Sequence, residues 1–418
     1  MADWSPNLVR APLLYDLTTM GVTIRDVRAV CTAPAGHNLI VVKVETSEPG
    51  LYGVGCATFS QRHSAVIAAI EHHYKPLVVG RNVSRIEELF QVMMVNGYWR
   101  NGPVLNNAIS GIDMALWDIK GKQANMPLFD LFGGACRSAA QVYVHADGSS
   151  LQEVCDSVGS CIDQGYRFVR VQRDGYGGSE SAIRKPEGSS TGRYVDPQGY
   201  VRETLETLDR IRSDFGAEIE LVHDIHERLL PIEAVQFAKD LEQFRLFFLE
   251  DPLSPEDVDW LPRIRANSAI PIAMGELFSN PVEWKNLVAD KLIDFIRIHL
   301  SQIGGITPAR HLVSFANQFS IRSAWHGPGD VSPVGHAANL HLDLWAPNFG
   351  VQEWWQFPDQ IYEIFPGAPE VRDGYMYANE LPGLGIDIDE RNAARYPCRD
   401  SVVGWTETRR PDGSPTRP

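Results

Sequence analysis

Eight short apolar runs, each followed by a longer amphipathic stretch, alternate along the chain after Gly133. This alternation is typical of repeated βα units, and a closed parallel barrel requires eight of them. The runs are VYVHA, FVRVQ, IELVHD, LFFLE, PIAMGE, DFIRI, SIRSAWH and FGVQE. We therefore predict an α/β fold in which residues 136–375 form a modified TIM (β/α) barrel.

The chain on either side of the predicted barrel has a different pattern. Three apolar runs within residues 22–59 are separated by Gly, Pro and polar clusters, which predicts an antiparallel meander. Residues 64–131 repeat apolar side chains at helical spacing, so we expect residues 1–135 to form an α+β capping domain. The C-terminal segment 376–418 loses the alternation. We expect it to pack back on the cap, although its end, RRPDGSPTRP, could simply be mobile.

Composition excludes several kinds of partner. The chain has 38 Lys and Arg against 53 Asp and Glu, a net charge of -15, which argues against binding to nucleic acid because phosphates need a basic surface. No run approaches the ~18 apolar residues of a membrane span. The N-terminus has charges and prolines where a signal peptide needs an apolar region, so we expect a cytoplasmic protein with no membrane partner. The six cysteines lack CxxC spacing, which predicts free thiols.

A charged or imidazole side chain stands at or near the C-terminal end of every predicted barrel strand. In a parallel barrel, catalytic groups gather at this end because the strands and their following loops meet there. The eight residues are His145, Arg170, Asp224, Glu250, Glu276, Arg297, His326 and Glu353. We therefore predict that they line one catalytic rim.

The three acids among them, Asp224, Glu250 and Glu276, follow one another at intervals of 26 residues, the length of a short βα unit. Crowded carboxylates raise one another's pKa, so a cluster predicts a bound cation. Oxygen ligands alone favour a hard divalent ion, above all Mg²⁺. The alternative is that the acids pair with the arginines of the barrel and bind no metal. His226, in the motif HDIH, would lie beside the ion as an acid or base.

Together these motifs resemble the enolase superfamily over nearly the whole chain, from about Val22 to Trp405. The superfamily pattern comprises ALWDIKGK and PLFDLFGG in the cap and the three acids at the ends of the third, fourth and fifth barrel strands. Within the superfamily, the chain resembles the mannonate dehydratase subgroup, whose members dehydrate D-mannonate, D-gluconate or both. The motifs that carry this resemblance are VYVHAD, FVRVQ, HDIH, FLEDP, GELF, FIRIHLSQIGGIT, WHGPGDVSPVGHAANLHLDLWAPNFGVQE and GYGG.

The resemblance implies a hydro-lyase that removes the C2 proton of a sugar acid, passes through a metal-stabilised enediolate and loses the 3-hydroxyl. The substrate would be D-gluconate and/or D-mannonate, and the product 2-keto-3-deoxy-D-gluconate. The resemblance also implies one Mg²⁺ per subunit held by Asp224, Glu250 and Glu276, with His226 as general acid. The partner would be a small-molecule sugar acid, and the protein a homo-oligomer, either a tetramer or an octamer.

A tyrosine beside Arg170 would be the general base, because a neighbouring cation favours the phenolate. The loop after the second strand offers both Tyr176 and Tyr194, and Tyr176 in GYGG is the better match to the subgroup. By resemblance, Arg297 would pair with the substrate carboxylate and other rim groups would contact hydroxyls. The full set of implied substrate contacts is Ser60, Gln61, His145, Arg297, His326, Asp330 and Glu353.

Two features depart from the subgroup pattern. The cap carries Ser60 and Gln61 in ATFSQRH, where some members present Asn to the substrate. The motif WHGPGD carries Pro328 where efficient mannonate dehydratases have Ala, which indicates a member that is weak on mannonate, prefers gluconate, or is poor with both. Two alternatives to the main hypothesis therefore stay open: a low-activity or non-catalytic regulatory homologue, and a dehydratase for another acid sugar.

Overall fold

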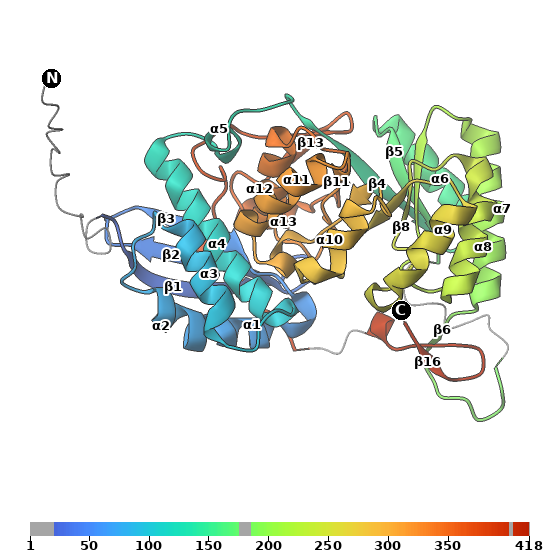
Figure 1. Cartoon of the computed structure of the whole chain (residues 1–418), viewed down its shortest axis with the longest axis horizontal. Helices are drawn as coiled ribbons and strands as arrows, with labels where there is room; N and C mark the ends of the chain where they lie inside the picture. The colour runs from blue at the N-terminus through green and yellow to red at the C-terminus, as the bar shows by residue number, and fades with distance from the viewer. Residues whose placement is uncertain (1–20, 175–184, 401–403, 418) are drawn as a thin grey trace, which may run out of the picture.

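The computed structural model describes residues 21–174, 185–400 and 404–417. Its centre is a barrel of eight parallel strands, as the alternation in the sequence predicts (Figure 1). Neighbouring strands follow the order β11-β10-β9-β8-β7-β5-β4-β12, and a bridge between Ser323 and Phe349 closes the ring. The barrel strands are β4 (Ala140–Gly148), β5 (Phe168–Arg173), β7 (Glu220–Asp224), β8 (Phe248–Glu250), β9 (Ile272–Met274), β10 (Phe295–Ile296), β11 (Arg322–Ser323) and β12 (Gln352–Glu353).

One layer of buried side chains fills the barrel interior, with one member from each strand or from the residue beside it. The layer consists of Tyr143, Phe168, Val222, Phe248, Ala273, Phe295, Ala324 and Val351. Aromatic and small side chains share this space, so the interior is a packed core rather than a pore. The hydroxyl of Tyr143 donates to Glu250 at 3.2 Å, which makes this layer the floor of the polar site above it.

Seven helices of the barrel units are α6 (Leu151–Asp163), α7 (Pro197–Phe215), α8 (Pro231–Leu241), α9 (Leu261–Asn267), α10 (Pro281–Ala289), α11 (Ile306–Asn317) and α12 (Pro333–Trp345). Several begin at a polar residue whose side chain accepts a backbone N–H of the first turn, which satisfies a donor that has no partner within the helix. These caps are Ser150, Asp196, Asn280 and Ser332.

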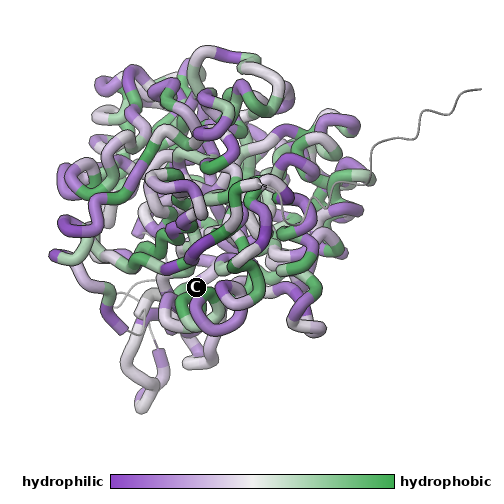
Figure 2. The backbone as a smooth tube through the Cα atoms, turned by 90° about the vertical axis from the view of Figure 1, so that its left-hand side faces the viewer, coloured by the Kyte–Doolittle hydropathy of each residue, from purple (hydrophilic) through white to green (hydrophobic). Residues whose placement is uncertain are grey.

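Apolar and polar stretches alternate along the chain (Figure 2). None of the described helices is long and apolar enough to cross a membrane.

The predicted meander is confirmed in the N-terminal region, which Figure 1 shows in blue beside the barrel. Strands β1 (Ile24–Thr32), β2 (Leu39–Thr46) and β3 (Tyr52–Cys56) pair in antiparallel order. The helices that follow are α1 (His63–Ala69), α2 (Lys75–Val78), α3 (Ile86–Asn96), α4 (Pro103–Ala124) and α5 (Leu128–Leu131). Strand β3 packs so closely on α4 that a Cβ at Gly55 would stand 2.1 Å from the carbonyl oxygen of Gly111. Glycine is therefore required at this contact.

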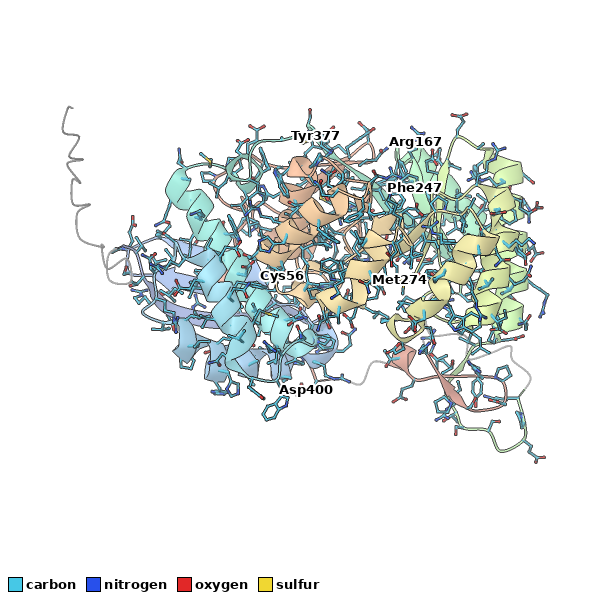
Figure 3. The ribbon with its side chains drawn as sticks, in the orientation of Figure 1. Cys56, Arg167, Phe247, Met274, Tyr377 and Asp400 are labelled. Atoms are coloured by element: carbon cyan, nitrogen blue, oxygen red, sulfur yellow. A yellow bond between two sulfur atoms is a disulfide. The ribbon has the colours of Figure 1, made fainter. Side chains whose placement is uncertain are left out.

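The chain between the last barrel strand and residue 400 contacts both domains. It contains α13 (Asp359–Ile364), β13 (Glu370–Arg372), β14 (Tyr375–Tyr377) and α14 (Glu390–Ala393), and β14 pairs with the start of β4. The backbone N–H of Leu384 then donates to Asp118 of α4 at 2.8 Å. Asp400, labelled in Figure 3, accepts a hydrogen bond from Ser64 of α1 at 3.2 Å. Residues 384–400 thus lie against the cap.

The final described residues, 404–417, contact loops of the barrel. From the sequence we expect them to pack on the cap, and the structure differs from that expectation. We call these residues the tail. Strands β15 (Thr408–Arg409) and β16 (Pro415–Thr416) form a small sheet with β6 (Arg193–Tyr194), which belongs to the loop after β5. The physical reason is this strand pairing, which no local pattern in the sequence indicates. Figure 1 shows this sheet below the barrel.

The prediction of free thiols is wrong for two of the six cysteines. Cys31 of β1 and Cys398 form a disulfide across a sequence separation of 367 residues, with a Cα–Cα distance of 6.0 Å. The fold brings them together because residues 384–400 run beside the cap. Spacing along the chain carries no signal for a pair this far apart.

We expect the denatured, unreduced protein to react with a thiol reagent at only four cysteines, because Cys56, Cys136, Cys155 and Cys161 are free. Reduction of the disulfide should make two more cysteines, Cys31 and Cys398, reactive. Spectrophotometric titration in denaturant before and after reduction measures both numbers. A Cys398→Ser variant is the control, since it should show an additional reactive thiol, Cys31, without reduction. Six reactive thiols in the unreduced protein would contradict the disulfide.

Candidate active site

The charged residues at the strand ends meet at the C-terminal end of the barrel. Hydrogen bonds and ion pairs link them into one continuous network, which runs from β4 and β5 through β7, β8 and β9 to β10, β11 and β12. All eight predicted rim residues belong to it, together with His226. The structure therefore brings these side chains together, while their individual roles stay predictions.

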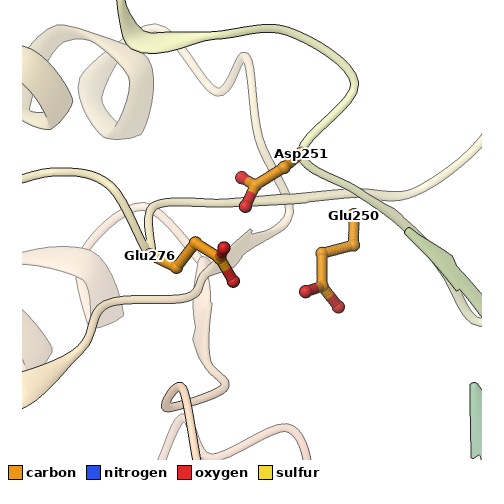
Figure 4. Close-up of side chains that lie close together, drawn as sticks. All are labelled: Glu250, Asp251 and Glu276. Atoms are coloured by element: carbon orange, nitrogen blue, oxygen red, sulfur yellow. The ribbon is translucent and has the colours of Figure 1, made fainter. Parts of the chain in front are cut away.

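Three carboxylates within the network form a compact group, which we call the carboxylate cluster: Glu250, Asp251 and Glu276 (Figure 4). One oxygen atom from each lies within 4.8 Å of the others. Glu250 and Asp251 are buried, and the side chain of Glu276 is 12% exposed. Oδ2 of Asp251 is buried and has no hydrogen-bond donor among the residues that the structure describes.

Asp251 is a member of the cluster that the sequence analysis missed. It follows Glu250 in the motif FLEDP, and in a regular strand its side chain would point to the opposite face. Its φ of 35° instead turns the chain at the end of β8. The backbone N–H of Gly275 then donates to Oδ1 of Asp251 at 3.2 Å and holds the carboxylate beside Glu276. The signal in the sequence that could have indicated Asp251 was the pair of successive acidic residues at the predicted end of a strand.

Burial is the largest influence on the cluster's ionisation. It raises the pKa of Glu250 well above the usual range, although the nearby Arg297 opposes this. It also raises the pKa of Asp251, where the charges of Glu276 and Asp224 act in the same direction. Ionising both groups therefore requires more positive charge than the protein supplies. Buried oxygen ligands with a deficit of positive charge fit a hard divalent cation.

Arg297 lies among these carboxylates and is fully buried. Its Nε atom is 3.0 Å from Oε1 of Glu250, and its Nη1 atom is 2.6 Å from Oε2 of Glu276. Its Nη2 atom donates to Glu353 and to the hydroxyl of Tyr143. The structure thus gives Arg297 protein carboxylates as partners, whereas the sequence suggests a substrate carboxylate. These ion pairs match the alternative interpretation of the acids, except that Oδ2 of Asp251 has no such partner within the described chain.

Asp224 does not belong to the carboxylate cluster. Its Oδ1 atom accepts the backbone N–H of His226 at 2.7 Å, and its Oδ2 atom accepts a hydrogen bond from Nη1 of Arg170 at 3.3 Å. It is nevertheless close enough for its charge to raise the pKa of Asp251. A role for Asp224 as a metal ligand stays a prediction.

His226 faces the cluster from the turn after β7. Its Nε2 atom is 3.5 Å from Oε1 of Glu276. Burial lowers the pKa of His226, but the contact with Glu276 and the charge of Asp224 outweigh burial and raise the pKa overall. The raised pKa favours the protonated imidazole, which is the form that can donate a proton.

His145 connects two of the other rim residues. Its Nδ1 atom is 3.0 Å from Nη2 of Arg170, and its Nε2 atom is 2.8 Å from Oε1 of Glu353. Burial, and then the charge of Arg170, lower the pKa of His145. Because a guanidinium can only donate, the neutral imidazole accepts at Nδ1 and donates its Nε2 proton to Glu353.

Two family models match the chain. Residues 157–392 match the enolase C-terminal domain-like model, and residues 17–133 match the N-terminal domain model of mandelate racemase and muconate lactonizing enzyme. The chain belongs to the enolase superfamily. The resemblance seen in the motifs is thereby confirmed.

Similar proteins place this enolase-superfamily chain more narrowly. A D-galactonate dehydratase family member from Enterococcus gallinarum is 50% identical over 398 residues, covering 95% of this chain and 99% of the relative. A member of the same family from Salmonella enteritidis PT4 is 50% identical over 412 residues, covering 94% and 98%. The chain therefore belongs to the D-galactonate dehydratase family. A crystal structure of an enolase from Pantoea ananatis with bound D-gluconate and Mg has a TM-score of 0.93 and 49% identity, covering 95% of this chain and 100% of that one.

The structure of this superfamily member adds two site residues that the sequence analysis did not single out. Tyr143 donates to Glu250 and accepts hydrogen bonds from Arg297. Nδ1 of His299 is 2.8 Å from Nδ1 of His326, whose Nε2 atom is 3.4 Å from Glu276. Tyr143 stands two residues before His145, and His299 stands two residues after Arg297. This spacing places side chains on one face of an extended chain, so it was a usable signal. Tyr143 and His299 are therefore also members of the network.

Of the two tyrosines considered as a base, Tyr176 lies outside the described residues. Tyr194 is buried in β6, and its hydroxyl donates to the carbonyl oxygen of Ser190 at 2.7 Å. The ammonium of Lys185 lies 4.3 Å from the centre of its ring. The hydroxyl of Tyr194 is therefore occupied within its own loop.

The three remaining predicted contacts belong to the cap and to the loop after β11. Ser60 and Gln61 belong to the short helix η1 (Ser60–Arg62) of the cap, where the hydroxyl of Ser60 donates to the carbonyl oxygen of Asn38 at 2.8 Å. Asp330 lies in the loop between β11 and α12 and is partly exposed. Within the described part of the chain, no hydrogen bond or ion pair joins these three side chains to the carboxylate cluster.

Proposed function

We propose that this chain is a cytoplasmic hydro-lyase that dehydrates a sugar acid, D-gluconate and/or D-mannonate, to 2-keto-3-deoxy-D-gluconate. The observation that carries the proposal is the carboxylate cluster with the imidazole of His226 3.5 Å from Glu276. Removing a proton next to a carboxylate needs a positive charge for the developing anion, and loss of a hydroxyl needs an acid. The site offers a place for both. The dehydratase name of relatives at 50% identity supports this reaction class.

Mg²⁺ is the cation that we propose, one per subunit. Glu250, Asp251 and Glu276 would hold it, with Asp224 as the further ligand predicted from the sequence. The unpartnered Oδ2 of Asp251 and the raised pKa of the two buried acids fit such an ion. When bound, the ion supplies electrostatic stabilisation of the negative charge that develops on a substrate carboxylate. The Pantoea ananatis protein, whose crystal structure holds Mg and D-gluconate, supports this choice.

The proton transfers are assigned to side chains of this chain. His226 would hold a proton and donate it to the departing 3-hydroxyl, which its raised pKa favours. Arg170, buried within β5, would lower the pKa of a tyrosine that abstracts the C2 proton. We propose Tyr176 for this role, because the hydroxyl of Tyr194 donates to Ser190.

The other rim groups would orient the sugar. His145, His326 and Glu353 would contact hydroxyls from the barrel. Arg297 would hold the carboxylates of the barrel in place and contact the substrate only secondarily, because its nearest partners are Glu250, Glu276 and Glu353. The remaining proposed contacts, from the cap and the loop after β11, are Ser60, Gln61 and Asp330.

The test is an assay of the purified protein, with Mg²⁺ and after removal of metal, against D-gluconate, D-mannonate, D-galactonate and other aldonic and aldaric acids. Formation of a 2-keto-3-deoxy acid is detected colorimetrically and identified by NMR. We expect metal-dependent product from D-gluconate or D-mannonate. Absence of product from every acid, while calorimetry still detects bound Mg²⁺, would contradict the dehydratase and favour a non-catalytic homologue.

A second candidate, dehydration of another acid sugar, is favoured by the family name of the relatives, which refers to D-galactonate. The same assay separates the candidates, because product from D-galactonate alone would replace the proposed substrates. We also propose that the protein is a homo-oligomer, either a tetramer or an octamer. Size-exclusion chromatography with multi-angle light scattering would measure its molar mass.

A further inference from the structure

The tail contacts three loops, which follow the barrel strands β5, β7 and β8. The first is the loop after β5, whose strand β6 pairs in parallel with β15 through Arg193–Thr408 and Tyr194–Arg409. The backbone N–H of Val195 also donates to the carbonyl oxygen of Arg409, at 2.8 Å. The tail is therefore hydrogen-bonded along the described end of this loop.

The second connection is made by Arg417, at the end of the tail. Its Nη1 atom is 2.9 Å from Oδ2 of Asp257, its Nη2 atom is 3.4 Å from Oε2 of Glu256, and its Nε atom is 3.7 Å from Oε2 of Glu227. Asp257 and Glu256 lie in η4 (Pro255–Trp260), which follows β8, and Glu227 directly follows His226. One guanidinium thus joins the loops after two adjacent strands of the barrel.

Of the three partners of Arg417, Glu227 is the one next to His226 in the chain. Its side chain is 14% exposed, whereas that of Glu256 is 72% exposed, so solvent screens the contact with Glu227 least. A guanidinium can reach three carboxylates at once because its donors are spread over a rigid plane. A lysine ammonium would be a single point charge and could not match this geometry.

The turn that carries His226 needs such support. His226 and Glu227 have φ values of 53° and 51°, so two successive residues with side chains occupy the left-handed region. This conformation is unfavourable for residues other than glycine and persists only where surrounding contacts fix it. Asp224 accepts the N–H of His226, and the carbonyl of Asp251 accepts the N–H of Glu227 at 3.1 Å. Arg417 adds the contact to the side chain of Glu227.

We propose that Arg417 is a positioning residue for His226. By holding Glu227 against the loop after β8, Arg417 fixes the turn that directs the imidazole towards Glu276. Among the described residues, the ion pairs of Arg417 are with Glu227, Glu256 and Asp257, and neither His226 nor Arg170 is one of its partners. This inference rests on the proposed function, because the imidazole is the general acid only if the chain is a dehydratase.

The activity test compares Arg417→Ala and Arg417→Lys with a matched control, Arg395→Ala. Arg395 is an exposed arginine of the C-terminal segment, and it forms an ion pair with Glu363 at 3.7 Å. For Arg417→Ala we expect kcat to fall about 10-fold or more with KM nearly unchanged, the size of effect found for residues that orient a catalytic group through another contact. Arg417→Lys should recover only part of this loss, and Arg395→Ala should match the wild type. Equal kcat in Arg417→Ala and the wild type would overturn the proposal.

A second measurement does not depend on activity. Amide hydrogen exchange of residues 225–230, measured without substrate, should become at least about 10-fold faster in Arg417→Ala, since local opening controls exchange. Unchanged exchange would overturn the positioning role even if the wild type proves to be a dehydratase. Faster exchange together with an inactive wild type would instead reject the proposed function and leave the support of the turn established. If Arg417→Ala does not fold, Asp257→Asn removes the shortest of the three contacts and should give the same change to a smaller extent.

Discussion

Replacing Glu276 by Gln is expected to reduce metal-dependent dehydration on the order of 10³-fold, the scale on which a lost electrostatic group slows a reaction that develops negative charge. Glu276 offers one oxygen to the carboxylate cluster and stands beside both His226 and His326. Neutralising it would remove a ligand charge and also the group that raises the pKa of His226. Steady-state kinetics over a range of Mg²⁺ concentrations and calorimetric titration of Mg²⁺ measure the two effects separately.

Glu363→Gln is the matched control for this change, because Glu363 is an exposed glutamate whose ion-pair partner is Arg395. Its activity and Mg²⁺ affinity should equal those of the wild type. If Glu276→Gln keeps activity within about twofold of the wild type, the carboxylate cluster is not the metal site that the reaction uses.

Replacing His226 by Asn is expected to lower kcat by about 10²–10⁴-fold, the usual contribution of a positioned general acid. Mg²⁺ affinity should change much less, because His226 is not a member of the cluster. The pKa of His226 is raised, so the acid stays protonated below that pKa, and kcat of the wild type should fall as the pH rises through it. The variant should lose this basic limb of the pH profile of kcat.

The control for His226→Asn is His311→Asn, since His311 is an exposed histidine that pairs with Glu87 at 3.2 Å on the outside of the molecule. This variant should keep both the rate and the pH profile of the wild type. A His226→Asn enzyme with an intact basic limb would assign the general acid to another group, such as His326, whose Nε2 atom is 3.4 Å from Glu276.

The fold was predictable because barrel strands carry a strong local signal. Each strand is a short apolar run that must bury one face in the interior, and the layer from Tyr143 to Val351 takes one side chain from every run or its neighbour. The polar end of each run was equally readable, since the barrel geometry brings all strand ends to one rim. Family motifs then assigned roles that spacing alone could not.

What the sequence could not reveal depends on contacts between distant segments or on a local break in regularity. Asp251 joins the cluster only because its positive φ interrupts strand alternation. The three carboxylate partners of Arg297 follow or end three other strands, so its surroundings could not be inferred from its own motif. The pairing of β15 with β6 and the bond between Cys31 and Cys398 likewise join segments that the chain separates widely.

The disulfide has a consequence for how firmly the tail is held. With Cys398 bonded to β1, only residues 399–407 separate a fixed point on the cap from β15 on the barrel. A short tether keeps the tail at a high effective concentration near its binding surface, and this concentration falls when the tether lengthens. Reduction would remove this covalent attachment and leave Asn38 of the cap hydrogen-bonded to the backbone of Arg399. When that remaining contact opens, the tether lengthens and the local concentration of the tail falls, so Arg417 would spend a smaller fraction of time on Glu227.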